Sequence, residues 1–80
     1  MVLLHIGSDI TVNLDDVVAI MDRQACEHVP ITRDYLDWAR AEDRMHGAVD
    51  AATKTFVITT HGIYPSPISS TTLSRRAAAF

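Results

Sequence analysis

Apolar and polar residues alternate at the start of the chain in a pattern that predicts two short strands. The segment VLLHI, residues 2–6, is an apolar run of strand length, and GSD follows it as a turn signal. In ITVNL, residues 10–14, isoleucine, valine and leucine alternate with threonine and asparagine, as in a half-buried strand. We therefore expect a β-hairpin whose turn is formed by residues 7–9.

A third strand is expected over residues 17–21, where β-branched and apolar residues lie between acidic ones. A helix that starts at residues 14–16 is the competing interpretation of this segment. The stretch RQACEHV, residues 23–29, is interpreted as a connector that leads from the third strand to the next element.

The clearest helical pattern is PITRDYLDWARAEDRM, residues 30–45. Thr32 is the expected N-cap, and Asp34 lies in the first turn, where the helix dipole favours a carboxylate. Ile31 is expected to pack onto the helix as a hydrophobic staple. The helix should end near Arg44. Its expected apolar face consists of Tyr35, Leu36, Trp38, Ala39 and Met45.

Three more strands are expected in the second half of the chain. The segment GAVDA, residues 47–51, is the expected fourth strand. The segments TFVITT, residues 55–60, and GIYPS, residues 62–66, are the fifth and sixth, joined at a tight turn by His61-Gly62.

The last segment predicts a short helix after an edge strand. Pro65 cannot donate a ladder hydrogen bond, so its strand lies at an edge or ends there. Ser69 or Ser70 caps a C-terminal helix in which Leu73 and Phe80 share the buried face. The order βββαβββα predicts a single α+β domain that spans the whole chain, with a small, mainly antiparallel sheet, one central helix and a short C-terminal helix.

The composition favours a small protein that assembles with copies of itself. A domain of 80 residues buries only about 60% of its unfolded surface, so a hydrophobic content of 48% is high for a monomer. No apolar run reaches the roughly 18 residues that span a membrane, and the first residues lack the basic region of a signal peptide. We therefore expect a cytoplasmic homo-oligomer without membrane contact.

Charges are distributed unevenly along this chain of net charge -3. All ten acidic residues lie between Asp9 and Asp50, whereas residues 51–80 hold no acid and only the bases Lys54, Arg75 and Arg76. This asymmetry predicts either head-to-tail self-association or a local anion-binding face. The two arginines either stabilise a helix C-terminus or contact an acidic partner.

No motif for catalysis or metal binding is recognisable. The four histidines lack metal-ligand spacing, and the single Cys26 has no C-x-x-C partner, so a small buried hydrophobe is expected there. Asp15 and Asp16 would point to opposite faces of a strand and cannot converge on one substrate. The three glycines are isolated, which excludes a glycine-rich phosphate loop. We expect no enzyme activity, cofactor, metal or small-molecule substrate.

Three segments of the chain carry a family resemblance. They are LLHIGSDITVNLDDVVAIMD at the start, ITRDYLDWARAEDR in the expected helix, and KTFVITTHGIYPSPISSTTLSRR from Lys54 to Arg76. The last is the most specific, because a tyrosine, two prolines and the Ser-Ser turn stand in the family's order in IYPSPISSTTLSRR. The chain resembles the RemA/RemB family of bacterial extracellular-matrix and biofilm regulators, and it is closer to the RemB branch.

The resemblance implies a DNA-binding transcriptional regulator without a helix-turn-helix. Proteins of the RemA type assemble into closed rings that present arginines to the DNA backbone, which here would make Lys54, Arg75 and Arg76 the DNA-binding residues. The chain departs from DNA-binding members at two places. Asp16 stands where they have a basic residue, and the loop AATKT, residues 51–55, is shorter than their arginine-rich loop.

Two hypotheses from different functional classes follow. The first is a ring-like homo-oligomer that binds DNA through backbone contacts, with avidity from repeated weak contacts. The second is an oligomeric scaffold or protein-interaction module that has lost DNA binding, which Asp16 and the short loop favour. A third is a small-ligand sensor that uses the histidines.

Overall fold

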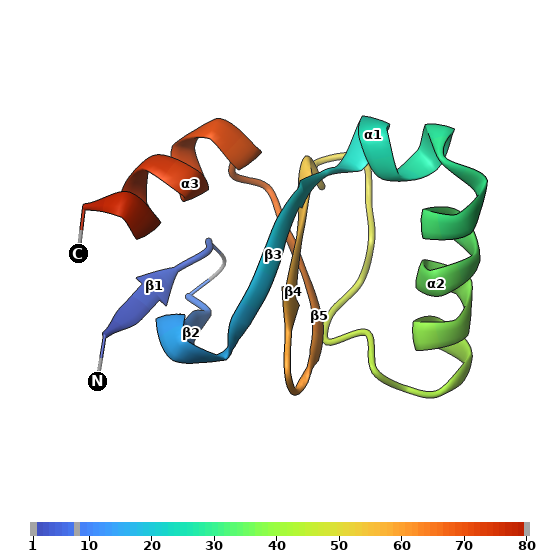
Figure 1. Cartoon of the computed structure of the whole chain (residues 1–80), viewed down its shortest axis with the longest axis horizontal. Coiled ribbons are helices and arrows are strands. Elements are labelled where there is room, and N and C mark those ends of the chain that lie inside the picture. The colour runs from blue at the N-terminus through green and yellow to red at the C-terminus, as the bar shows by residue number, and fades with distance from the viewer. Residues whose placement is uncertain (1, 8, 80) are drawn as a thin grey trace.

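The computed structural model describes residues 2–7 and 9–79, in which short strands and helices follow one another along the chain (Figure 1). In chain order the elements are β1 (Leu3–His5), β2 (Thr11–Asn13), the 3-10 helix η1 (Leu14–Asp16), β3 (Val17–Asp22), α1 (Arg23–His28), α2 (Pro30–Ala41), β4 (Thr55–Thr59), β5 (Gly62–Ser66) and α3 (Ser70–Ala78). This is an α+β arrangement, as the sequence predicts.

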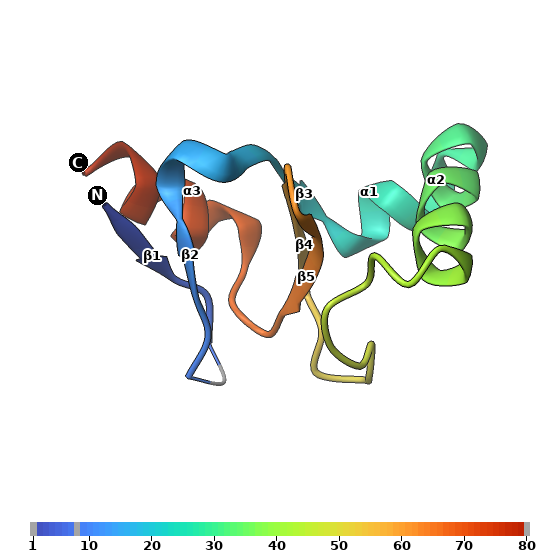
Figure 2. The ribbon, with the colours of Figure 1, turned by 90° about the horizontal axis from the view of Figure 1, so that it is seen from below.

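Within the described residues the strands form two antiparallel sheets. β1 pairs with β2, and β3, β4 and β5 form a second sheet in that order. The helices α1 and α2 lie on one side of the second sheet, and the β1–β2 hairpin and α3 lie on the other (Figures 1 and 2). The described chain is elongated as a result, with principal extents of 32 × 22 × 20 Å.

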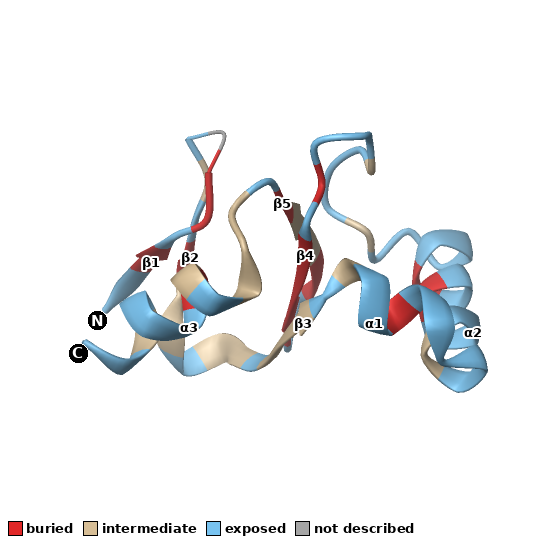
Figure 3. Ribbon diagram, turned by 90° about the horizontal axis from the view of Figure 1, so that it is seen from above, coloured by how far each residue is buried: buried red, intermediate tan, exposed pale blue. Residues whose placement is uncertain are grey.

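The central strand β4 is buried along its whole length (Figure 3). Successive side chains of a strand point to opposite faces, so β4 contributes to a core on each side of the sheet. The core on the hairpin side contains Leu4, Ile6, Val12, Val57 and Leu73. The core on the helix side contains Cys26, Leu36, Ala39, Phe56, Ile58 and Ile63.

The predicted hairpins and third strand are confirmed. β1 and β2 pair as expected, and β3 lies where the third strand is predicted. β5 forms one edge of its sheet, in agreement with Pro65, and its turn from β4 consists of Thr60 and His61, one residue earlier than expected. Ser8, in the first expected turn, lies outside the described residues.

The C-terminal helix α3 has the predicted serine cap. The Ser69 Oγ accepts a hydrogen bond from the backbone N–H of Thr72 at 3.2 Å, which satisfies one of the free amides at the helix start. Leu73 is fully buried, as expected. Phe80, its expected partner on the buried face, lies outside the described residues.

The interpretation of residues 23–29 as a connector is wrong, because residues 23–28 form the helix α1. Asp22 caps this helix, since its carboxylate accepts hydrogen bonds from the backbone N–H groups of Gln24 and Ala25. Cys26 is buried in the helix-side core, as a small hydrophobe is expected to be, and it anchors α1 to the sheet.

Helix α2 begins and ends earlier than predicted. Val29 rather than Thr32 is the N-cap, because Pro30 occupies the first helical position, where its missing N–H is not needed. The helix ends at Ala41, before the expected boundary. Asp43 then adopts a φ of 59°, a left-handed conformation that a helix cannot continue.

Only part of the predicted apolar face of α2 is buried. Leu36 and Ala39 enter the core, whereas Tyr35 and Trp38 are 41% and 49% exposed. Ile31 is 77% exposed, so the expected hydrophobic staple does not cover it. The apolar face of α2 is therefore only partly buried, since Tyr35 and Trp38 stay exposed, and the expectation of a staple at Ile31 is wrong.

The predicted strand over residues 47–51 does not form. The edge of β5 is contacted by the preceding residues instead, because the His46 N–H donates to the Ile63 carbonyl at 2.7 Å and the Ile63 N–H donates to the Arg44 carbonyl at 2.8 Å. Met45 makes an isolated bridge to Ile63 between these two bonds. The edge that a strand over 47–51 would need is thus already occupied.

Replacement of Gly62 should show how closely residues 44–46 approach β5. Gly62 has a φ of 134°, and a Cβ atom there would collide with the Arg44 carbonyl oxygen and the His46 ring. We expect Gly62→Ala to lower the free energy of unfolding by well over about 1 kcal/mol, measured by urea denaturation. Gly47→Ala is the control, because Gly47 also has a positive φ but its Cβ would lie 3.7 Å from Pro65. If Gly62→Ala and Gly47→Ala lower the free energy of unfolding equally, the close approach of Arg44 and His46 is not what requires glycine at position 62.

Candidate functional site

Lys54 lies directly before β4, at the end of the sheet where α1 and α3 begin (Figure 1). Its N–H donates to the Ser66 carbonyl at 2.8 Å, and its carbonyl accepts a hydrogen bond from the Arg23 N–H at 2.9 Å. Lys54 is exposed. The fold therefore fixes the backbone of this residue and leaves its side chain in solvent.

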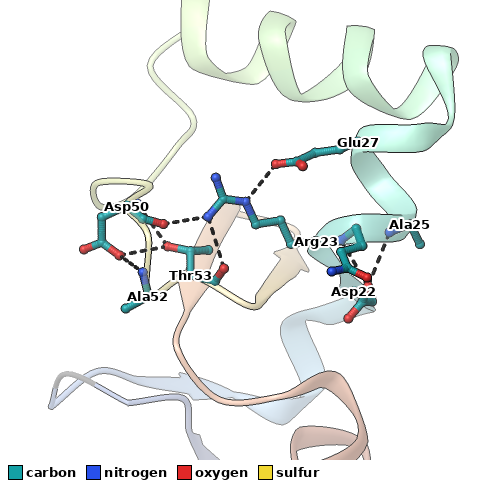
Figure 4. A network of polar contacts seen from close by, with 8 residues as sticks. Asp22, Arg23, Ala25, Glu27, Asp50, Ala52 and Thr53 are labelled. Atoms are coloured by element: carbon teal, nitrogen blue, oxygen red, sulfur yellow. Dashed lines mark hydrogen bonds and ion pairs between the residues drawn. The ribbon is translucent and has the colours of Figure 1, made fainter.

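The loop before Lys54 is held by Arg23, the first residue of α1 (Figure 4). The Arg23 Nη1 donates to the carbonyl oxygens of Asp50 at 2.6 Å and Thr53 at 3.1 Å, and its Nε donates to Glu27 Oε1 at 2.8 Å. A planar fork of donors can make these bonds together, and a lysine ammonium cannot reproduce that geometry. Arg23 thus ties α1 to the loop that positions Lys54.

Side chains within the loop add local bonds (Figure 4). The Asp50 Oδ1 accepts from the Ala52 N–H at 2.9 Å, and the Thr53 Oγ1 accepts from the Asp50 N–H at 3.2 Å. The role of Arg23 cannot be read from the sequence pattern, because its loop partners are 27 and 30 residues further along the chain. The one local signal is Glu27, four residues after Arg23 on the same helix.

Lys54 borders an open groove of about 500 Å³ in which charges of both signs are present. The carboxylates of Asp22 and Glu27 line this groove with Arg23, which is already paired to Glu27. Ser69, the cap of α3, lies at the same groove. The two acidic side chains weaken the positive potential around Lys54 relative to an isolated basic patch.

The two arginines of α3 differ in their surroundings, although both lie in its last turn as expected. The Arg76 Nη1 donates to the His5 carbonyl of β1 at 3.2 Å, so Arg76 links the helix to the hairpin. Arg75 is exposed, and the described residues include no ion-pair or hydrogen-bond partner for its side chain. Arg75 is therefore the freer cation of the pair.

These basic residues do not converge on one patch. Lys54 shares its groove with Ser69 at the start of α3, and Arg75 lies about 9 Å further along that helix. Asp16 is more distant, because it precedes the first residue of β3 whereas Lys54 precedes Thr55, which pairs with the last residue of β3. A strand of this length spans about 20 Å. Asp16 and Lys54 thus lie at opposite ends of the sheet.

The acidic residue at position 16 contacts a histidine. The Asp16 Oδ2 lies 3.4 Å from the His61 Nε2, and the Asp16 carbonyl accepts from the Thr60 N–H at 3.0 Å. The His46 Nε2 lies 2.7 Å from the His61 carbonyl oxygen, and the His46 ring stacks on Tyr64. These contacts organise the β4–β5 turn.

Two other kinds of site are absent from the described residues. Residues 2–7 and 9–79 contain no group of three or more histidine, cysteine, aspartate or glutamate side chains that could hold a metal ion. Among the helices in this part of the chain, none is both long and apolar enough to cross a membrane.

Comparison with known proteins identifies the family. Residues 3–77 match the family described as RemA-like, Extracellular matrix regulatory protein A-like. The chain belongs to the RemA-like family. It is also 35% identical over 74 residues to Extracellular matrix regulatory protein B of Bacillus subtilis (strain 168), and the match covers 92% of this chain and 88% of that protein. The resemblance to the RemB branch is thereby confirmed.

The matched part of this RemA-like chain includes Lys54, Arg75 and Arg76. It also includes the segment that holds Arg23, Asp50 and Thr53 together. The candidate cations and the network that positions one of them therefore both lie in the region that the chain shares with its family.

Loss of the Arg23 fork should release the loop before Lys54. In Arg23→Lys we expect the backbone amides of residues 52–54 to exchange with solvent about tenfold faster, because hydrogen bonds to charged groups contribute roughly 1.5–3 kcal/mol. Hydrogen exchange followed by NMR measures the change. Arg40→Lys is the matched control, since Arg40 is exposed, lies 3.9 Å from Asp37 on its own helix, and among the described residues donates no hydrogen bond to the loop. Equal exchange in both variants would exclude Arg23 as the residue that holds the loop.

The Cys26 thiol should react slowly in the folded protein. Burial raises the pKa of this thiol, and the nearby carboxylates of Asp22 and Glu27 raise it further. The folded state therefore favours the protonated thiol, so its contribution to stability is present below the unfolded-state pKa and is lost as pH rises through the folded-state pKa. We expect an aromatic disulfide reagent at pH 8 to react at least about tenfold faster in urea than in buffer. Equal rates would contradict a buried thiol.

Proposed function

We propose that this RemA-like chain is a non-enzymatic, cytoplasmic regulator that forms a ring-like homo-oligomer and contacts the DNA backbone. Lys54 is the first contact residue, and Arg75 and Arg76 are further candidates. The observation that carries the proposal is the exposed apolar surface of α2, which consists of Ile31, Tyr35 and Trp38. Exposed apolar surface of this kind marks protein contacts. The name of the relative, Extracellular matrix regulatory protein B, supports a regulatory role.

One subunit alone should bind DNA weakly. Each phosphate contact adds only about 0.9 to the slope of log affinity against log salt, and Lys54 shares its groove with the carboxylates of Asp22 and Glu27. A ring repeats the same weak contact at fixed spacing, and linked weak contacts produce avidity. We therefore expect binding to depend on assembly and to fall steeply with salt.

The two arginines contribute to such a contact unequally. One guanidinium nitrogen of Arg76 is bound to the His5 carbonyl, which limits its reach. Arg75 has no such restraint among the described residues, and it lies near the C-terminal end of α3. Arg75 contacts DNA only if assembly leaves this end of the molecule open.

A second candidate function is an oligomeric scaffold or protein-interaction module without DNA binding. The acidic Asp16 supports it, since the resemblance places a basic residue there in DNA-binding members. The acidic lining of the Lys54 groove supports it as well. Both observations reduce the attraction of this chain for a polyanion.

Light scattering followed by a DNA titration tests the proposal. The oligomer mass is measured first, and the same sample is then titrated with a labelled duplex by fluorescence anisotropy at low and moderate salt. A large oligomer that binds with a steep salt dependence supports the DNA-binding regulator. An oligomer that does not bind at low salt overturns DNA binding and leaves the scaffold function.

Substitution of Lys54 should show whether its positive charge contributes to DNA affinity while the oligomer stays intact. We expect Lys54→Ala to weaken binding to unrelated duplexes to the same extent, and to reduce the salt slope by about 0.9 for each contacting subunit, with the oligomer mass unchanged. Lys54→Arg keeps the charge and should retain most of the affinity. Unchanged affinity in Lys54→Ala would exclude this residue as a DNA contact.

A further inference from the structure

An open groove of about 530 Å³ is lined by residues of α1, α2, β4 and the loop between α2 and β4. Its floor is apolar. Leu36 of α2 and Phe56 of β4 belong to the helix-side core, and Val49 of the loop packs against that core. We call this site the α1–α2 groove. Its volume lies within the range of roughly 300–1,000 Å³ that is usual for sites of small molecules.

The rim of the α1–α2 groove holds more positive than negative charge. Three arginines, two carboxylates and one imidazole line it, and they belong to Arg23, Glu27, His28, Arg33, Asp37 and Arg40. The arginines outnumber the carboxylates by one, although the whole chain has a net charge of -3. A concave site with such a local excess attracts a small anion.

The three arginines are not equally available to a ligand. Arg23 is already engaged, because it donates to one carboxylate and to two loop carbonyls. Arg40 lies 3.9 Å from Asp37, and it also lines an adjoining groove together with Asp43. Arg33 is exposed, and among the described residues its side chain has no hydrogen-bond or ion-pair partner. Arg33 is therefore the arginine that a ligand can bind at the lowest cost.

The position of Arg33 combines this free charge with the apolar floor. Leu36 follows Arg33 by three residues, so both side chains lie on one side of α2, and both line the groove. A guanidinium binds a carboxylate through two parallel hydrogen bonds. The excess of a single positive charge matches a ligand with one negative charge better than a polyphosphate.

We propose that the α1–α2 groove binds a small molecule with an apolar body and one carboxylate. Arg33 binds the carboxylate, and the apolar body rests on the floor formed by Leu36, Val49 and Phe56. This inference goes beyond the proposed function and does not depend on DNA binding. It also differs from the ligand sensor expected from the histidines, because an arginine makes the charged contact.

An NMR titration of the isotope-labelled protein with phenylacetate tests the site. A ligand of this size in an open groove should bind with a Kd of about 1 mM. We expect saturable shifts of the Arg33 Nε–H and of the backbone amides of His28, Asp37 and Val49. The absence of a saturable shift at about 10 mM phenylacetate would overturn the inference. Shifts spread over all basic residues, Lys54 and Arg75 included, would show non-specific anion binding and overturn it as well.

Three further probes separate the charge of the ligand from its apolar body. Phenylacetamide lacks the charge and acetate lacks the ring, so each should bind at least about tenfold more weakly than phenylacetate. Phenyl phosphate carries a charge of about -1.5 to -2 and should also bind more weakly, because the rim has one positive charge in excess. Equal or tighter binding of any of these probes would overturn the proposed ligand class.

Substitution of Arg33 tests the proposed charged contact. We expect Arg33→Gln to weaken phenylacetate binding at least about tenfold, because a hydrogen-bonded charge is lost. Arg75→Gln is the matched control, since Arg75 is also an exposed helical arginine without a described partner, and it should leave the Kd unchanged. Far-UV circular dichroism checks that both variants keep their helices. An unchanged Kd in Arg33→Gln would overturn the inference.

Removal of a rim carboxylate should have the opposite effect. We expect Asp37→Asn to tighten phenylacetate binding about twofold, because Asp37 lies four residues after Arg33 and competes with the ligand for the same charge. Asp34→Asn is the control, since Asp34 is exposed on the same helix but does not line the groove. Equal effects of the two substitutions would show that binding follows the net charge of the chain, and would overturn a site in the α1–α2 groove.

Discussion

Burial of β4 on both faces is the constraint on which the rest of the structure depends. Val57 needs the β1–β2 hairpin and α3 as cover, while Phe56 and Ile58 need α1 and α2. A sheet of three short strands cannot bury both faces by itself, so the chain distributes its other elements to the two sides. The helical side and the hairpin side are consequently far apart, and they meet mainly through the sheet.

Side-chain hydroxyl groups of the central sheet form hydrogen bonds to the hairpin and to the segment before α3. The Ser66 Oγ, fully buried, donates to the Ile6 carbonyl at 2.7 Å and accepts from the Ile68 N–H, and the Thr55 Oγ1 donates to the Ile68 carbonyl at 2.7 Å. A buried hydroxyl without such a partner costs roughly 1–3 kcal/mol. These hydroxyl groups therefore act in structure: Ser69 caps α3, and Ser66 ties the end of β5 to the hairpin.

The sequence was informative where local chemistry decides the structure. Alternation predicts the first hairpin, the His61-Gly62 turn signal predicts the second, and the serine at position 69 or 70 predicts the start of α3. The six-residue α1 escapes detection, since its pattern is too short for a helical period and its stability comes from the Asp22 cap and buried Cys26. Periodicity places Trp38 on the apolar face of its helix, but it cannot show that the side chain stays half exposed in the folded chain. At the candidate site, charge alone identifies Lys54, whereas Arg23 acts through backbone carbonyls that only the folded chain brings near.

The three candidate cations differ in how far the fold restrains them. Both faces of the central sheet are used for the two cores, so the candidate cations lie outside it. Lys54 lies directly before the first residue of β4, where hydrogen bonds hold its backbone and its side chain is exposed. Arg75 is exposed in the last turn of α3, whereas Arg76 donates to the His5 carbonyl of its own chain. In the proposed ring, Lys54 would therefore repeat once in every subunit on a fixed backbone, while Arg76 would be restrained by its bond to β1.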